Sequence, residues 1–204
     1  MVCFGIHAVH YHVTGKAFRQ PGTSLSAREE NDMRTFGHIT SRTERMLISQ
    51  ESGTLESWAI LNQSASGFLC MLRQPEAQAC IAHNQLLGVR RAASRLFYLG
   101  LVQWLRLEES GEINVGVRLF PGVPQAIAVR PANFNPAGGG SRYERALLLP
   151  EVPAPATPAT VVLPTGWFQA GRFVEVHTER RQVAKLVALL EKGRDFDRAT
   201  ITIV

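Results

Sequence analysis

The stretch WAILNQSASGFLCML, which runs from Trp58 to Leu72, decides the fold, because two apolar strand patterns flank six small, mostly polar residues. On each side of the interruption, alternate residues share one face of an extended strand: Trp58, Ile60 and Asn62 before it, and Phe68, Cys70 and Leu72 after it. Asn and Ser side chains bond to nearby backbone in turns, and Gly67 permits a positive φ. The stretch therefore predicts two antiparallel strands joined by a tight turn.

The turn itself has two physical interpretations. Asn62, Ser64 and Gly67 are residue types that reverse a chain, so the segment can be a plain hairpin connection. The exposed N–H groups of a tight turn also form a concave patch of donors for an anion. The Asn62 amide carries both a donor and an acceptor, as reading the edge of a nucleobase requires. The residues alone leave both interpretations open.

Further short strand patterns recur about every 8–12 residues, which is typical of β-barrels and sandwiches. After the hairpin, strands are expected at residues 86–91, 95–107, 113–120 and 125–130, with an acidic loop at 108–112 that contains Gly111. Towards the C-terminus, five segments read as strands: ALLLP (146–150), ATVVLPTGWF (159–168), GRFVEVH (171–177), RQVAKLVALL (181–190) and ATITIV (199–204). KLVALLEKG (185–193) also fits a short helix.

The N-terminal region predicts a strand followed by a polar segment. Alternating apolar residues favour a strand or hairpin arm over residues 2–18. Within residues 16–57, Ser26 and Glu29 have the spacing of a capping box, which predicts a short helix near 27–36. The segment PANFNPAGGGSR (131–142) reads as a linker between a first unit, residues 1–130, and a smaller unit, residues 143–204.

Composition restricts the class of protein. The 204 residues are 45% hydrophobic and 19% charged, as is ordinary for a globular protein. No apolar run approaches the ~18 residues of a membrane span. The N-terminal residues Met1–Gly5 contain no basic residue, so they do not have the pattern of a signal peptide. Three cysteines without a pairing pattern fit a reducing cytoplasm. The net charge of +5 favours an anionic partner, but no basic stripe interleaved with aromatics indicates extended nucleic-acid binding.

The chain shows no pattern of a metal centre or a catalytic site. On a strand, His10 and His12 would share a face and His7 would lie opposite, so three ligands could not converge. Ser64 and Ser66 lie in no nucleophile elbow. We expect no enzyme and no cofactor.

The hairpin and the strands after it resemble a known family. Asn62–Gly67 (NQSASG) is similar to the (Asp/Asn)-x-Ser-x-x-Gly signature of PilZ domains, six-stranded β-barrels that bind the bacterial second messenger cyclic di-GMP. GLVQWLR (100–106) and VGVRLF (115–120) follow in the order of that family. The resemblance implies a mainly β chain: a PilZ-like six-stranded antiparallel β-barrel, with an insertion carrying a short helix, and a second, smaller β-domain like that of longer PilZ-like proteins.

The resemblance departs from the family in its arginines. Nucleotide-binding PilZ domains carry Arg-x-x-x-Arg before the first barrel strand, whereas Arg42 and Arg45 are spaced one residue short. Either these two arginines are a degenerate version of the motif, or residues 2–15 are the first barrel strand and 16–57 are an insertion. We prefer the second explanation, in which the motif would belong before Met1. Arg106 shares a strand face with Trp104, and if the barrel matches PilZ it would lie near the mouth of the barrel.

The resemblance implies a non-enzymatic signalling module of a bacterial cytoplasm. It would bind cyclic di-GMP through Asn62, Ser64 and Gly67, with Arg42, Arg45 and Arg106 as candidate arginines, and pass the signal to a protein partner or neighbouring domain. The alternative is a degenerate barrel that has lost the nucleotide and serves protein interaction or dimerisation. A nucleic-acid-binding barrel would rest on net charge alone.

Overall fold

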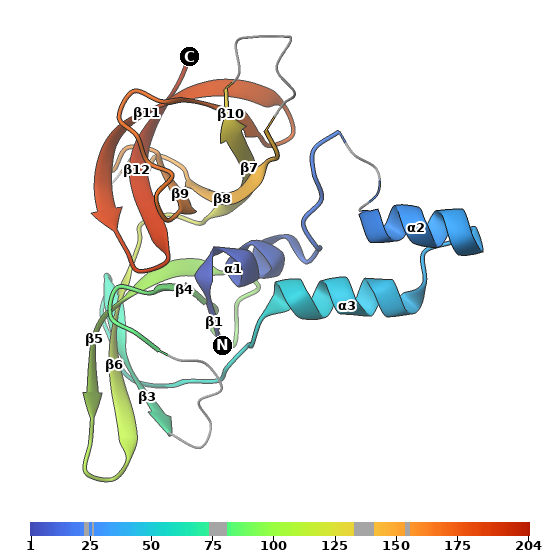
Figure 1. Ribbon diagram of the computed structural model, residues 1–204. Helices are drawn as coiled ribbons and strands as arrows, with labels where there is room; N and C mark the ends of the chain where they lie inside the picture. Colours follow the sequence, from blue (N-terminus) through green and yellow to red (C-terminus); the bar gives the residue numbers. More distant parts are fainter. Residues whose placement is uncertain (23–24, 26, 74–80, 133–140, 154–155) are drawn as a thin grey trace.

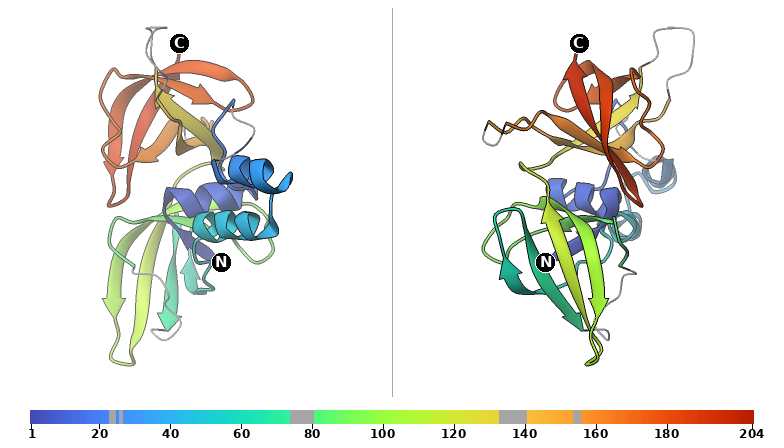
Figure 2. Two further views of the ribbon diagram at one scale, coloured as in Figure 1. Left: turned by 45° about the vertical axis from the view of Figure 1, so that its right-hand side comes forward. Right: turned by 90° about the vertical axis from the view of Figure 1, so that its left-hand side faces the viewer.

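The computed structural model describes all residues except 23–24, 26, 74–80, 133–140 and 154–155. Two antiparallel β units lie one above the other, with helix α1 between them and helices α2 and α3 to one side (Figure 1). Both views of Figure 2 keep α1 between the units. The prediction of a mainly β chain with two β units is confirmed, but the first unit, predicted as a six-stranded barrel, is an open six-stranded sheet, and the closed barrel is the second unit.

The first unit is a six-stranded sheet with the order β1-β4-β5-β6-β3-β2. Its strands are β1 (Val2–Phe4), β2 (Ala59–Gln63), β3 (Gly67–Arg73), β4 (Leu86–Val89), β5 (Tyr98–Leu107) and β6 (Glu112–Leu119). The predicted hairpins β2–β3 and β5–β6 are both present, and Gly111 in the second turn has a φ of 83°.

The N-terminal segment differs from its prediction. Strand β1 ends after three residues, where Gly5 takes a φ of 75°, and α1 (Gly5–Thr14) follows. The strand predicted over residues 2–18, and the first barrel strand at 2–15, are therefore wrong. The same residues also carry a helical pattern: the side chains that α1 buries are Ile6, Ala8, Val9 and His10.

The short β1 leaves the first sheet open. Val2 alone reaches the segment before β2, through a bridge in which its N donates to Glu56 O (2.7 Å) and Glu56 N donates to its O (2.8 Å). The described edge strands β1 and β2 share no ladder. A three-residue strand is too short to close a barrel along its length.

The second unit is a closed barrel with the order β10-β11-β12-β9-β8-β7. Its strands are β7 (Gln125–Pro131), β8 (Glu144–Leu149), β9 (Thr160–Pro164), β10 (Phe173–His177), β11 (Arg181–Lys192) and β12 (Phe196–Ile203). Residues 185–192 are strand, so the helical alternative for them is wrong. Because β7 pairs with β8 and β10, the segment 131–142 connects two neighbouring strands, and we place the boundary between the units before β7.

The polar segment after α1 forms two helices. Helix α2 (Ala27–Phe36) confirms the short helix that was predicted, although Ser26 of its capping box lies outside the described residues. Helix α3 (Ser41–Ser52) was not predicted; the Thr40 side chain caps it by accepting from Thr43 N at 3.3 Å. In the described part of the chain, no helix is long and apolar enough to cross a membrane.

One hydrophobic cluster connects the units. It combines α1 with strands of both sheets: Ile6 and Val9 from the helix, Leu86 and Leu99 from the first unit, and Leu147 and Val162 from the second. The units therefore share a core, which holds the surface of the first sheet in a fixed position against the barrel.

Candidate functional site

The side chains of the β2–β3 turn stabilise the turn itself. Ser64 N donates to Gly67 O at 2.8 Å, and the Ser64 hydroxyl donates to the same oxygen at 3.2 Å. Asn62 Oδ1 accepts from Gln63 N at 2.7 Å. Asn62 and Ser64 thus form the local hydrogen bonds expected of turn residues. The bond to Gln63 uses the Asn62 amide oxygen, so the two N–H donors of the amide nitrogen are not used in it.

Gly67 is needed for close approach and not for an unusual backbone angle. The described residues with positive φ do not include it, so the expected positive φ is wrong. A Cβ at this position would lie 2.2 Å from Val117 O on β6. Gly116, on the same strand, lies beneath the Trp104 indole, where a Cβ would meet the ring nitrogen at 2.2 Å. Two glycines therefore let the turn and the indole lie close to β6.

A bulge directs Trp104 outward. The β5–β6 pairing shifts between Val102 and Trp104, which leaves Gln103 as an extra residue. Trp104 is 46% exposed, whereas a tryptophan on a sheet is more often buried. An exposed indole held flat against a glycine is a surface on which a nucleobase can stack.

An open hollow of about 390 Å³ brings these groups together. Its polar and aromatic lining consists of Asn62, Gln63, Ser64, Ser66, Phe68, Gln103, Trp104 and Arg118. The three turn residues that the sequence predicted, Asn62, Ser64 and Gly67, all line it. Such groups are able to hydrogen-bond a base edge, stack on a base and pair with a phosphate.

Arg118 supplies the positive charge of the hollow. It lies opposite Gly67 in the β3–β6 register and forms an ion pair with Glu191 on β11. Arg198 reaches the same carboxylate at 3.2 Å, and both guanidinium groups lie over the Phe120 ring, at 5.2 Å and 4.5 Å from its centroid. A smaller hollow of about 280 Å³ at the junction of the units shares Gln103 and Arg118 with the first. Arg118 therefore links the turn to the closed barrel.

The structure places the three predicted arginines elsewhere. Arg42 and Arg45 are exposed on α3 and do not line the hollow. The Arg106 side chain is 70% exposed, and its guanidinium pairs with Glu108 at 2.6 Å. Arg118 was missed because only the β3–β6 register places it beside the turn; it belongs to the quoted VGVRLF segment, but nothing local marks it.

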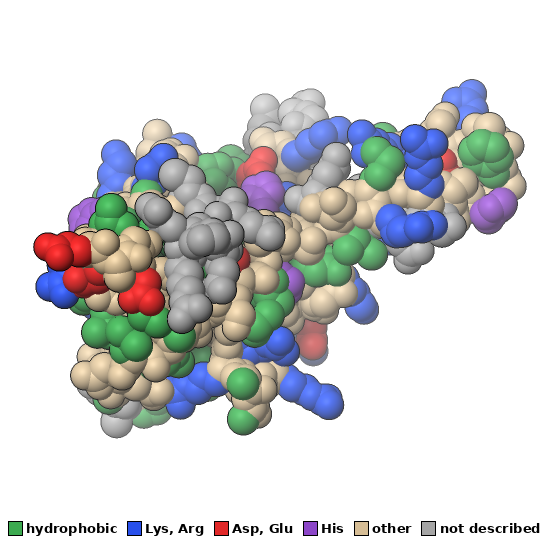
Figure 3. All heavy atoms as spheres, turned by 90° about the horizontal axis from the view of Figure 1, so that it is seen from below, with side chains coloured by type: hydrophobic (Ala, Val, Ile, Leu, Met, Phe, Trp, Pro, Cys, Tyr) green, Lys and Arg blue, Asp and Glu red, His purple; other side chains and the backbone are tan. Residues whose placement is uncertain are grey.

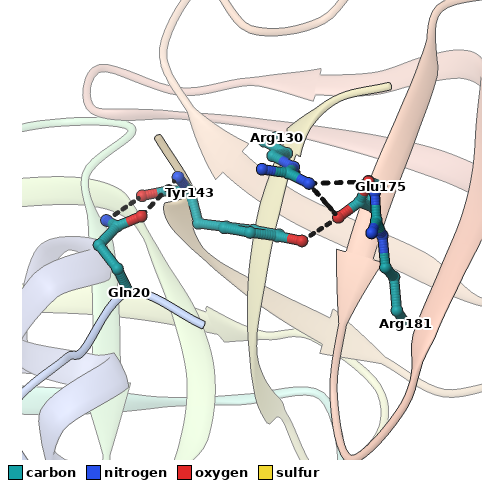
Figure 4. Close-up of polar contacts among 5 residues, drawn as sticks. All are labelled: Gln20, Arg130, Tyr143, Glu175 and Arg181. Carbon is teal, nitrogen blue, oxygen red and sulfur yellow. Dashed lines mark hydrogen bonds and ion pairs between the residues drawn. The ribbon is translucent and has the colours of Figure 1, made fainter. Parts of the chain in front are cut away.

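A second polar cluster lies on the closed barrel (Figure 4). Glu175 is 4% exposed and accepts hydrogen bonds from Tyr143, Arg130 and Arg181. Burial raises the pKa of the Glu175 carboxyl, but these hydrogen bonds outweigh burial and leave the pKa below its usual value. Gln20 joins the cluster through two bonds to the Tyr143 backbone, at 2.8 Å and 2.9 Å. Both arginines form ion pairs with Glu175. The two bonds from Gln20 to Tyr143 hold the segment before α2 against the barrel.

The histidines and thiols have mainly structural environments. His10 is buried on α1, and burial, followed by the charge of Arg145, lowers its pKa to about 4. Burial raises the pKa of the Cys3 and Cys70 thiols to about 12, so neither is a thiolate at neutral pH. Among the described residues no group of three or more His, Cys, Asp or Glu side chains is placed to hold a metal ion.

Charge on the lower face of the molecule is dispersed. In Figure 3, acidic side chains gather at one end of this face, whereas Lys and Arg side chains are scattered around it and do not merge into a stripe. The turn between β5 and β6 carries Glu108, Glu109 and Glu112. A continuous basic track for a nucleic acid is not visible on this face.

Comparison with known proteins gives two similarities. Residues 127–204, which contain most of β7 and all of β8–β12, match the family described as the FimW C-terminal β-barrel domain. The chain is also similar to the cyclic-di-GMP receptor FimW of Pseudomonas aeruginosa, with 29% identity over 125 residues, 60% of this chain and 20% of that protein. The match therefore spans about a fifth of the length of this curated relative. No solved structure matches the chain.

Proposed function

We propose that this chain is a non-enzymatic module that binds cyclic di-GMP in the hollow at the β2–β3 turn and transmits the binding event to the closed barrel. The observation that carries the proposal is the convergence of Asn62, Ser64, Trp104 and Arg118 on one hollow. The similarity to a cyclic-di-GMP receptor and the PilZ-like turn sequence support the choice of ligand.

Each group of the hollow has a role that suits a guanine nucleotide. Trp104 offers an exposed ring face for one guanine. The Asn62 amide nitrogen can donate to a base acceptor while its oxygen keeps the turn in shape. Arg118 can pair with a phosphate oxygen, which is a geometry that guanidinium groups favour.

Transmission would pass through Arg118. Glu191 and a bound phosphate would compete for its guanidinium, and Glu191 would retain Arg198 when Arg118 turns to the ligand. Binding would therefore weaken one contact between β6 and β11 and favour a different arrangement of the units or of a protein partner.

A specific observation favours a second candidate, a barrel that has lost the nucleotide and acts in protein interaction or self-association. Arg42, Arg45 and Arg106 do not line the hollow, and the arginine that does is already paired with Glu191. This candidate predicts that cyclic di-GMP does not bind, and that the chain forms a complex with itself or another protein.

The substitution Asn62→Ala tests the proposed role of the turn. If the turn binds nucleotide, the change weakens cyclic di-GMP affinity about tenfold, because it removes one or two hydrogen bonds. The melting temperature should then fall by only a few degrees, since one exposed turn bond is lost. Gln20→Ala, which breaks polar bonds far along the chain from the turn, is the control for a purely structural loss. A melting temperature that falls with affinity unchanged would limit Asn62 to reversing the chain.

A further inference from the structure

A larger cavity, of about 680 Å³, lies in the open six-stranded sheet. It shares Ser66 and Phe68 with the hollow at the turn, but Asn62, Trp104 and Arg118 do not line it. Residues of both edge strands border it, Val2 on β1 and Ile60 on β2. The missing ladder between these strands therefore leaves the interior of the sheet accessible. Its size lies in the range of small-molecule sites, about 300–1,000 Å³.

The lining of this cavity separates by polarity. The deeply buried members are apolar, with Val2 2%, Trp58 7% and Cys70 1% exposed. Arg90 and Ser94 are half-buried, and Arg91 is exposed. The lining therefore combines a buried apolar part with two arginines that are more exposed.

The side chains that line the cavity carry positive charge, and the buried Glu56 carboxylate behind the lining accepts a hydrogen bond from the Trp58 indole at 2.9 Å. Among the described residues that line the cavity, none is acidic. No hydrogen bond or ion pair to a described residue involves the Arg91 guanidinium, and Arg90 Nε is buried without a hydrogen-bond partner in the same part of the chain. Arg90 instead lies over the Phe97 ring, at 5.5 Å from its centroid. A buried donor without a partner is costly, and a ligand oxygen would satisfy it.

We propose that this cavity binds an anionic amphiphile, a molecule with an acid headgroup on an apolar body. The body occupies the space beside Trp58, Cys70 and Val2, where it is removed from water. The headgroup lies beside Arg90 and Arg91 and accepts hydrogen bonds from both. The site touches the nucleotide hollow at Ser66 and Phe68 but uses none of the groups assigned to the nucleotide, so its test does not depend on cyclic di-GMP binding.

Calorimetric titration of the chain with decanoate, below its micelle concentration, tests the proposal. We expect saturable binding at one site, whereas acetate, which has the headgroup without the body, gives no measurable binding. Arg91→Glu should weaken decanoate binding about tenfold or more, because it removes a charge-assisted hydrogen bond and introduces repulsion. Arg95→Glu is the matched control, since Arg95 is an exposed arginine of the same loop that does not line the cavity.

The outcomes separate cleanly. Decanoate binding that falls with Arg91→Glu and persists with Arg95→Glu supports the site. Absence of saturable binding overturns the proposal. Binding that both variants weaken equally, or that neither weakens, places decanoate elsewhere and also overturns it. Arg91 is exposed, so its replacement leaves the fold intact.

Discussion

At the scale of single residues, the β2–β3 turn depends on the side chains of Asn62 and Ser64 and on the absence of a side chain at Gly67. Asn62 and Ser64 form the local hydrogen bonds that their residue types predicted. Gly67 was expected to supply a positive φ, but it is required because the β6 backbone passes where its Cβ would lie. In the sequence, a glycine needed for a positive φ cannot be distinguished from a glycine needed for close approach of another strand. Only the neighbouring strand distinguishes them, and that strand is distant in the sequence.

His10 makes the stability of the chain depend on pH. Its pKa in the folded chain is about 4, below the value of about 6.5 expected when unfolded, so the unfolded state binds the proton more readily. The stability is complete above the unfolded pKa and is lost as the pH falls through 6.5 towards 4. Between pH 7 and pH 5, we expect the free energy of unfolding to fall by about 2 kcal/mol from this group. The lowered pKa values of His7 and His12 act in the same direction.

Urea unfolding at the two pH values measures this effect. His10→Phe removes the titrating group at a position that packs edge-on against Phe18, and the difference between pH 7 and pH 5 should shrink. His38→Asn, at an exposed histidine, is the control and should leave the difference unchanged. A pH dependence that persists in full in His10→Phe would contradict the assignment.

At the scale of elements, periodicity predicted the strands but not the N-terminus. The strand segments were found because their apolar residues alternate and turn residues separate them. Residues 5–14 contain valine, tyrosine and histidine in an order that fits either period. The positive φ of Gly5 ends β1, and Ile6 and Val9 of α1 pack between the two flanking sheets, so these residues form a helix. Tertiary packing therefore decides between strand and helix here, and local propensity does not.

Strand pairing likewise decides which arginine reaches the turn. The sequence suggested Arg42 and Arg45 from their spacing and Arg106 from the strand face it shares with Trp104, whereas register places Arg118 opposite Gly67. The outward position of Trp104 depends on the bulge at Gln103. Bulges and register depend on two paired strands, so the sequence of one strand alone does not reveal them.

The ion pair between β6 and β11 yields a test of transmission. Glu191→Gln removes the carboxylate that competes with a phosphate for Arg118, so cyclic di-GMP affinity should rise, up to about fivefold for a partly exposed pair. Titration of both forms measures the change. Glu179→Gln, at an exposed glutamate of the same barrel, controls for loss of a negative charge and should have a smaller effect. Unchanged or weaker binding in Glu191→Gln would exclude Arg118 as the link.

At the scale of the whole molecule, the shared core makes the two β units one folding unit. The cluster around Ile6 and Val9 includes Leu147 and Val162 of the closed barrel, so each unit loses part of its buried apolar surface without the other, although each also has a cluster of its own. We expect equilibrium unfolding in one transition. Single-tryptophan variants that retain Trp58 or Trp167 report the two units separately, and their denaturation midpoints should coincide.

Leu147→Ala sharpens this expectation. Loss of a fully buried side chain should destabilise the chain by about 2–5 kcal/mol and move both midpoints together. Midpoints that separate, with only the Trp167 signal shifted, would show that the units unfold independently.

The central claim is that the hollow at the β2–β3 turn binds cyclic di-GMP by stacking on Trp104. Calorimetric titration of the chain with cyclic di-GMP, with Trp104→Ala and Leu107→Ala in parallel, tests it most directly. Leu107 is exposed on the same strand outside the hollow, so it is the matched control. We predict saturable binding that Trp104→Ala weakens about tenfold or more and Leu107→Ala leaves unchanged. No heat of binding at tens of micromolar protein, or equal affinity in all three forms, would contradict the account.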